Sequence, residues 1–335
     1  MGQRQVTFGL VVHPSKPVLD SVNIIKRFVH QYGGTLLVRE ADAPLVGPDI
    51  EAVAAGAFVD RLDAVVSLGG DGTMLGAMRL VVGRDKPVLG VNYGKVGFLV
   101  EVSPAGLEAA LDRLVVGDYT LEPHSCLEII TNDDGVTAFN DVVVTASEPL
   151  VSMTVDLLVN GSRHGYYCGD AVIACTPTGS TAYNYAAGGP VISPSAPSIA
   201  LTPVAPMTGI SRSVVLGGKD GVELYNSSED ASLRITADGT PVGMLKPGDG
   251  LKLRLNEDAV NVVRFDPGIH QQRKRVQLSL LDLPLRPDQL LELVPPELRE
   301  RAEQFRAEQA RLEQAHPGRP PTVSGTPRKA GRTEP

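Results

Sequence analysis

Residues 64–73 read Ala-Val-Val-Ser-Leu-Gly-Gly-Asp-Gly-Thr, an apolar run that leads straight into a glycine-rich turn. The run predicts a short buried strand, and residues 74–82 predict the helix that follows it. Three glycines around one aspartate leave backbone N–H groups free to wrap a phosphate at the helix N-terminus. Asp71 adds a carboxylate that can act as a base or hold Mg²⁺. The alternative is an ordinary turn in which Asp71 or Thr73 caps the helix.

Strand and helix signals alternate around this turn. Strands rich in Val and Leu that are separated by helices indicate a parallel sheet covered on both faces. The sequence therefore predicts a doubly wound, Rossmann-like α/β domain over residues 1–120. Its expected strands are 6–12, 35–38, 64–68 and 87–91, and its expected helices are 19–32, 74–82 and 103–116.

From about residue 119 the pattern changes to short alternating strands separated by turn signals such as Asn160-Gly161 and Asp238-Gly239. This pattern is typical of an antiparallel β-sandwich, which we expect over residues 121–275. One helix is expected within it, near 181–187. The expected strands are 126–131, 141–146, 153–159, 171–175, 214–216, 233–236 and 251–255.

The composition shifts again after Pro295. Residues 297–315 form a charged stretch of helical character, and residues 316–335 are rich in Pro, Gly, Arg, Ser and Thr. A segment with so few apolar residues cannot bury enough surface to order itself, so we expect a disordered tail.

Charge and composition exclude several classes of function. The formal net charge of −8 gives no electrostatic support for nucleic-acid binding. No apolar run reaches the length of a membrane span, and the N-terminus does not resemble a signal peptide. The three cysteines lack zinc-ligand spacing, so no fixed metal site is expected, and their odd number fits a reducing cytoplasm.

A second polar motif is Thr176-Pro177-Thr178-Gly179-Ser180-Thr181-Ala182-Tyr183, followed by Ala187-Gly188-Gly189-Pro190. Four hydroxyls and a glycine at a helix start can form a pocket wall that accepts anions. Tyr183 adds a stacking face with a polar tip. The alternative is a capped helix whose hydroxyls have no ligand.

Two shorter motifs carry weaker signals. Asn140-Asp141 stands at the head of a predicted strand, where the amide can pair with an adenine edge and the carboxylate with ribose hydroxyls. An ordinary Asn-Asp turn is the simpler explanation. Residues 92–99 form a glycine-rich turn that would bring Lys95 near the first turn in a doubly wound sheet. The alternative there is a solvated lysine.

Taken in this order, the motifs resemble those of the NAD kinase family over residues 6 to about 280. The shared segments are 69–73, 94–99, 140–141, 169–170, 176–183 and 187–190. The first is also found in lipid kinases and phosphofructokinase-like enzymes, whereas 176–183 is far more specific.

The resemblance implies transfer of a phosphoryl group from ATP or polyphosphate to the 2′-hydroxyl of the adenosine ribose of NAD, which gives NADP. It implies that Asp71 is the general base and that the phosphate turn consists of Gly69, Gly70, Gly72 and Thr73. The NAD-binding residues that it implies are Asp71, Gly72, Asn140, Asp141, Asp170, Thr181, Ala182, Tyr183, Asn184, Tyr185 and Ala186.

The resemblance also implies Mg²⁺ or another divalent cation, which comes with the nucleotide and lies near Asp71. It further implies a homodimer or homotetramer in which Asp170 reaches a ribose of the neighbouring subunit. The expected location is the cytoplasm, with no nucleic-acid or membrane partner. Residues 276–295 are expected to return to the first domain.

Two other functions stay open. One is a non-catalytic NAD(P)-binding homologue, acting as a sensor or partner subunit; the other is a lipid kinase that shares the glycine turn. Several departures from the family pattern keep the first of these open, one of them Ala171, which follows Gly169-Asp170 where the family commonly has Gly. Gly76 stands where the family frequently has Arg, and Cys168 stands at a position that is often basic. Ala186 stands where Ser is common, and Met207 where His is common.

Overall fold

The computed structural model describes residues 5–94, 99–130, 135–148, 151–266 and 268. The expected charged helix and tail, and the expected return of 276–295 to the first domain, lie outside these residues. No helix among the described residues combines the length and the apolar character that a membrane crossing needs.

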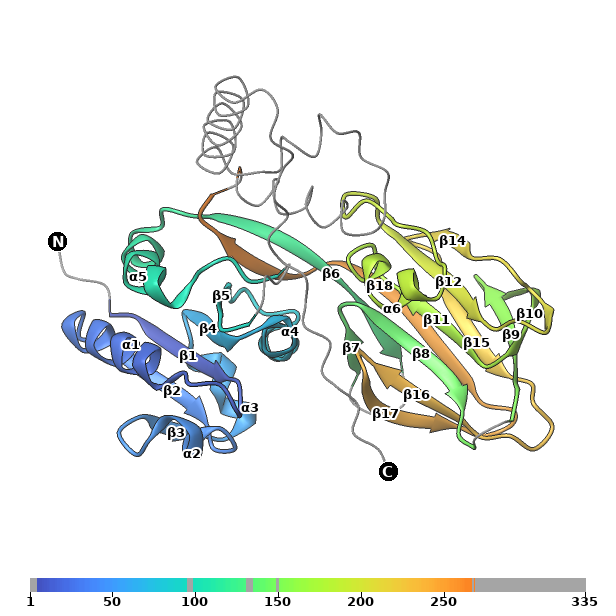
Figure 1. Ribbon diagram of the computed structural model, residues 1–335, viewed down its shortest axis with the longest axis horizontal. Coiled ribbons are helices and arrows are strands. Elements are labelled where there is room, and N and C mark those ends of the chain that lie inside the picture. The colour runs from blue at the N-terminus through green and yellow to red at the C-terminus, as the bar shows by residue number, and fades with distance from the viewer. Residues whose placement is uncertain (1–4, 95–98, 131–134, 149–150, 267, 269–335) are drawn as a thin grey trace, which may run out of the picture. The chain divides into compact units, whose positions relative to one another are not determined.

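The N-terminal part is built on five parallel strands (Figure 1). Their order in the sheet is β3-β2-β1-β4-β5, so the chain moves outward in one direction and then crosses over to continue in the other. This is the doubly wound arrangement that the sequence predicts. The strands are β1 (Thr7–Val12), β2 (Thr35–Arg39), β3 (Glu51–Val53), β4 (Ala64–Gly69) and β5 (Val88–Asn92).

Helices cover both faces of this sheet because successive side chains of a strand point to opposite sides. Leu10 of β1 packs in one hydrophobic core with Ile25 and Leu111, whereas the next residue, Val11, packs in another with Met74. The helices are α1 (Leu19–Gln31), α2 (Ala43–Val46), α3 (Ala55–Phe58), α4 (Asp71–Leu80) and α5 (Leu107–Val116).

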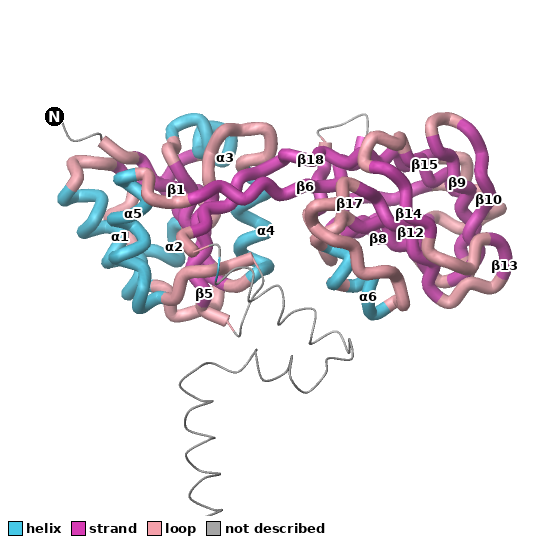
Figure 2. The backbone as a smooth tube through the Cα atoms, turned by 90° about the horizontal axis from the view of Figure 1, so that it is seen from above, coloured by secondary structure: helices cyan, strands magenta, loops and turns pink. Residues whose placement is uncertain are grey.

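The C-terminal part consists of antiparallel strands in two layers, with one core of buried Val, Leu and Ile residues between them (Figure 2). One layer is a six-stranded sheet of order β14-β12-β11-β8-β16-β17. It comprises β8 (Asp141–Ala146), β11 (Ala171–Cys175), β12 (Ser198–Val204), β14 (Val214–Gly217), β16 (Leu233–Ala237) and β17 (Thr240–Leu245). The predicted antiparallel β-sandwich is therefore confirmed.

The other layer is continuous with the N-terminal sheet. Its strands are β6 (Thr120–Ile130), β7 (Val136–Ala138), β9 (Met153–Val159), β10 (Ser162–Gly169), β13 (Thr208–Gly209), β15 (Val222–Asn226) and β18 (Gly250–Arg264). A short helix, α6 (Tyr183–Ala186), stands where the sequence predicts the one helix of this part.

Two long strands, β6 and β18, run side by side and link the two parts (Figures 1 and 2). They pair from Lys252 to Arg264, with an irregularity between Asn256 and Val260. Beyond that irregularity Val262 pairs in parallel with Val88 of β5. The chain thus returns to the first sheet within β18, and both strands extend well beyond the segments 126–131 and 251–255 that the sequence predicts.

Candidate active site

The glycine turn joins β4 to α4. Gly69 has to be a glycine, because a Cβ there would lie 2.1 Å from Oγ1 of Thr73. Gly70 and Gly72 differ, since a Cβ at either position would meet no atom of the described part of the chain within 4 Å. Gly70 is the N-cap residue and has no side chain to cap the helix, so neither Asp71 nor Thr73 is the N-cap. Packing within the described protein therefore explains Gly69, but it does not explain why Gly70 and Gly72 are glycines.

Asp71 is the first residue of α4, where the helix dipole favours a negative charge. Its Oδ1 accepts a hydrogen bond from the N–H of Leu99 at 3.1 Å. The carbonyl of Leu99 in turn accepts from the buried guanidinium of Arg264 at 2.8 Å. Arg264 also pairs with Glu122, with 2.6 Å between Nε and Oε2. A partly buried ion pair thus holds the guanidinium that bonds to Leu99, the residue whose N–H orients the Asp71 carboxylate.

The second and third motifs meet in space. Asn140 precedes β8, and its carbonyl accepts from the N–H of Thr176 at 3.0 Å. A Cβ on Gly179 would lie 1.9 Å from that same carbonyl oxygen, so only glycine fits there. Oγ1 of Thr176 donates to the carbonyl of Phe139 at 2.6 Å and accepts from the N–H of Gly179 at 2.9 Å. The turn after β11 is therefore bound to the backbone that carries Asn140.

Several polar groups of this turn have partners within the protein. Asn184 is fully buried, and its amide bonds to the carbonyls of Ser180 and Pro190 and to the hydroxyl of Thr202. The Ser180 hydroxyl, also fully buried, bonds to the backbone of Pro177 and Ile192. These side chains hold the turn in shape.

Other predicted residues of the turn lie nearer the surface. Tyr183 is 46% exposed, and Ala186 is exposed as well. Thr181, Ala182 and Tyr185 are half-buried. The predicted pocket wall thus divides into a supporting layer and a layer that solvent or a ligand can reach.

Asp141 is a buried carboxyl at the start of β8. Burial and the nearby charge of Asp238 raise its pKa to about 6. The two carboxyls are neighbours because the N–H of Asp141 donates to Oδ1 of Asp238 at 3.1 Å. Asp141 therefore gains or loses its charge close to neutral pH.

Asp238 is a residue that the sequence indicates only as part of a turn. It lies in the Asp238-Gly239 turn between β16 and β17, with a positive φ of 45°. An Asp-Gly pair between two strands is the signal of such a hairpin, and nothing in that signal says where the carboxylate points. The fold brings it to the backbone of Asn140 and Asp141.

The sequence singles out two further residues, Asp170 and Lys95. Asp170 is exposed and separates β10 from β11. Residues 95–98, which include Lys95, lie outside the described residues.

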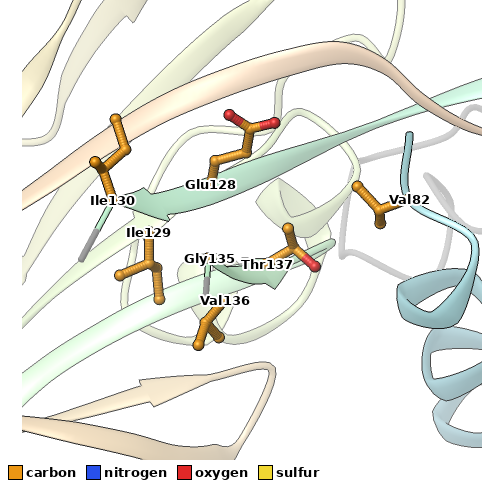
Figure 3. Close-up of a pocket in the computed structure, with 7 residues that line it drawn as sticks. All are labelled: Val82, Glu128, Ile129, Ile130, Gly135, Val136 and Thr137. Atoms are coloured by element: carbon orange, nitrogen blue, oxygen red, sulfur yellow. The ribbon is translucent and has the colours of Figure 1, made fainter. Parts of the chain in front are cut away.

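A small hollow of about 270 Å³ lies along the β6–β7 hairpin (Figure 3). Figure 3 shows Glu128 and Ile130 on one side of β6 and Ile129 on the other. The lining is Val82, Glu128, Ile129, Ile130, Gly135, Val136 and Thr137, none of which is a predicted site residue. Among the described residues, no three His, Cys, Asp or Glu side chains form a cluster that could hold a metal ion.

Comparison with known proteins agrees with the motifs. Residues 8–119 match the model of the ATP-NAD kinase N-terminal domain, and residues 139–265 match that of the ATP-NAD kinase C-terminal domain. The chain is 34% identical over 264 residues to the NAD kinase of Sulfurimonas denitrificans, which covers 76% of this chain and 90% of that protein. It is 38% identical over 224 residues to the NAD kinase of Gemmatimonas aurantiaca, covering 65% and 78% respectively.

Two solved structures share the fold. A yeast NADH kinase complexed with NADH has a TM-score of 0.74 at 20% identity, over 84% of this chain and 89% of the other. An NAD kinase from Archaeoglobus fulgidus in complex with ATP has a TM-score of 0.63 at 22% identity, over 82% and 98%. The two matched domains and the curated relatives assign the chain to the NAD kinase family, and its activity is the phosphorylation of NAD to NADP.

Proposed function

We propose that Asp71 is the general base that takes the proton from the 2′-hydroxyl of the adenosine ribose of NAD. A secondary alcohol has a pKa far above 7, so it needs a positioned base to attack phosphorus. The observation that carries the proposal is the setting of this carboxylate. It stands at a helix N-terminus between glycines with open space and is oriented by the N–H of Leu99.

The glycine turn would receive the donor phosphates. Gly70 and Gly72 leave space beside the backbone of the first turn of α4. Gly69 and the side chain of Thr73 pack against each other within that turn. Phosphoryl transfer asks mainly for positioning and for neutralisation of charge, which such a turn provides.

The donor we propose is ATP, with polyphosphate as the alternative. The matched family is described as ATP-NAD kinase, and one solved relative was crystallised in complex with ATP. Mg²⁺ fits as an ion carried by the nucleotide, because Asp71 offers one carboxylate and Mg²⁺ commonly takes one or two together with phosphate oxygens. When bound, Mg²⁺ neutralises charge on the transferred phosphoryl group.

NAD would be held by the segment where the second and third motifs meet. Asn140 would pair with a nucleobase edge, and Asp141 would accept hydrogen bonds from ribose hydroxyls. Thr181, Ala182 and Tyr183 would line the pocket, and Tyr183 is exposed enough to stack on a ring. Tyr185 and Ala186 would complete the edge, while the buried Asn184 would support the turn from behind.

We propose further that the chain works as a homodimer or homotetramer in the cytoplasm. Asp170 is exposed, and it would reach a ribose bound to the neighbouring subunit. Tyr166 lies on β10 with Cys168, and the N–H of Met207, just before β13, donates to the carbonyl of Cys168 at 2.8 Å. Both Tyr166 and Met207 are large and exposed, and a neighbouring subunit would cover them. The three cysteines are free thiols, a state that a reducing compartment would maintain.

The test is an assay for NADP. The purified chain is incubated with NAD or NADH, each offered ATP or polyphosphate, in the presence of Mg²⁺. We expect NADP from NAD and ATP. Tight binding of NADP by calorimetry without any turnover would instead support the non-catalytic homologue, and phosphorylation of a lipid alcohol would support the lipid kinase.

A further inference from the structure

The carboxylate of Asp238 is almost completely buried, with 1% of its side chain exposed. Its Oδ1 accepts from the N–H of Asn140 at 2.7 Å and from that of Asp141 at 3.1 Å. Its Oδ2 accepts from the N–H of Phe139 at 2.9 Å. The N–H of Asp238 itself donates to the carbonyl of Asp141 at 2.9 Å. One residue therefore binds three consecutive peptide units of the segment proposed to hold NAD.

The same carboxylate is tied to the helix that carries the proposed base. Nη2 of Arg79 lies 2.6 Å from Oδ2 of Asp238. Arg79 belongs to α4, the helix that begins at Asp71, and stands about two turns further along it. A helix is stiff over this length, so its anchor at Arg79 also constrains where its first residue lies.

We propose that Asp238 is a positioning residue, which together with Arg79 sets the placement of Asn140 and Asp141 relative to helix α4 and its first residue, Asp71. This inference rests on the proposed function, because it takes Asn140 and Asp141 to hold NAD and Asp71 to act on its ribose. It adds a pair of residues that neither motif contains.

The chemistry of the contact favours this role over simple stabilisation. A buried carboxylate that accepts hydrogen bonds from three N–H groups and one guanidinium has nearly all of its lone pairs engaged. This fixes the orientation of both the 139–141 backbone and the Arg79 side chain. Substrate positioning is sensitive to small errors, since a displacement of about 1 Å can lower a rate roughly 100-fold. Loss of the clamp should therefore appear in NAD binding as well as in stability.

The charges around Asp141 give the proposal a pH signature. Asp238 faces it from the β16–β17 turn, Cys175 lies opposite it on β11, and Arg79 reaches Asp238 from α4. The thiol of Cys175 has a pKa raised to about 12 by burial and stays neutral. Removing the charge of Asp238 should lower the pKa of Asp141, whereas removing Arg79 should raise it.

The experiment compares Asp238→Asn, Arg79→Met and Arg79→Lys with the wild type and with Arg61→Met. Arg61 is the matched control, since it makes an exposed ion pair with Glu51 in the same domain. Calorimetry measures the NAD dissociation constant without donor from pH 5 to 8, and steady-state assays give kcat and both KM values. Thermal unfolding measures the folded fraction.

For Arg79→Met and Asp238→Asn we expect the NAD dissociation constant per folded molecule to rise roughly 5- to 50-fold. The KM for ATP should change much less. The pH midpoint of NAD binding should move upward in Arg79→Met and downward in Asp238→Asn. Arg79→Lys should recover part of the affinity by restoring the charge, though not the planar contact. Arg61→Met should behave like the wild type.

Unchanged NAD affinity and pH midpoints in Arg79→Met, with only a lower melting temperature, would overturn the inference and leave a structural ion pair. If Asp238→Asn does not fold, Arg79→Met decides the matter, because its side chain is 30% exposed and its loss is easier to accommodate. A wild type that makes no NADP would instead overturn the proposed function, so the two failures are distinguishable.

Discussion

The turn at Gly69–Thr73 and the turn at Thr176–Ala186 both join a buried strand to a helix, yet they use their residues in opposite ways. In the first, a side-chain carbon added at Gly70 or Gly72 would lie more than 4 Å from every described residue that packs around it. In the second, a carbon added at Gly179 would collide with a backbone carbonyl, and the polar side chain of Asn184 is fully buried.

This difference separates two uses of glycine and of polar residues. Where internal packing explains a glycine, the residue serves the fold. Packing does not explain Gly70 and Gly72, and the space beside them lies at a helix N-terminus, where a phosphate is the ligand that fits. Substitutions in each turn can test whether the two turns differ in this way.

The largest expected effect concerns Asp71. Asp71→Asn keeps the size and the hydrogen bond from Leu99 but removes the negative charge, so the proposed base is lost. We expect kcat to fall by roughly 10² to 10⁴-fold, with little change in the NAD dissociation constant. Steady-state kinetics and calorimetry measure the two quantities. A variant that kept more than about a third of the wild-type rate would rule out this role.

Next comes the second turn. Gly179→Ala would place its Cβ 1.9 Å from the carbonyl oxygen of Asn140, and backbone cannot move aside cheaply. We expect the free energy of unfolding to fall by ~2 to 4 kcal/mol. Urea unfolding measures it, with Gly76→Ala as the control because a Cβ at Gly76 meets none of the residues that the structure describes within 4 Å. Equal stability of the two variants would mean that the turn is not tightly packed.

The third prediction tests the contact with the nucleobase. Asn140→Ala should raise the KM for NAD by roughly 5- to 100-fold, since a lost amide contact leaves polar groups unpaired on both sides. The KM for ATP should change less, because the donor phosphates are assigned to the first turn. Equal weakening of both nucleotides, or of neither, would count against the pocket.

The smallest of these effects is one of pH. Burial and Asp238 raise the pKa of Asp141 to about 6, above its ordinary value near 4. The folded protein therefore holds an extra proton between these two values, and its stability falls as pH rises from about 4 to 6 and then levels off.

Asp141→Asn removes this titration. Below about pH 4 the variant and the wild type should approach the same stability, while at pH 8 the variant should be more stable by ~1 to 2 kcal/mol. Urea unfolding across this pH range measures the difference. A difference between the two proteins that is independent of pH would show that Asp141 does not titrate in the folded state near pH 6.

Much of the fold could be predicted because its strands carry strong local signals. The β1 and β4 segments are continuous apolar runs, and their predicted bounds differ from the observed ones by one residue. β10 was missed because its sequence, Ser-Arg-His-Gly-Tyr-Tyr-Cys-Gly, is largely polar and half-exposed. The length of β18 was missed because the irregularity after Asn256 interrupts the alternation of apolar residues in the sequence. The strand continues past this point because it pairs with β5 and β6, which are distant in the sequence.

The candidate site was predictable only where short motifs carry it. The turn at Asp71 and the segment at Asn140 are visible in the sequence, and the fold connects the second of these to Thr176 and Gly179. Asp238 was not identified, because an Asp-Gly turn looks the same whether its carboxylate faces solvent or a distant backbone. The burial of Asn184 was equally invisible, since its partners lie on other segments.

The measurement that tests the contrast between the two turns most directly is the rate of NADP formation by Gly72→Ala, read beside its melting temperature. A Cβ at Gly72 meets no atom of the described residues within 4 Å, so the fold should keep its melting temperature within about 2 °C. If the open space belongs to the donor phosphates, the rate should fall roughly 10- to 100-fold, while Gly76→Ala keeps the wild-type rate. A Gly72→Ala enzyme with both the wild-type rate and the wild-type melting temperature would contradict the account.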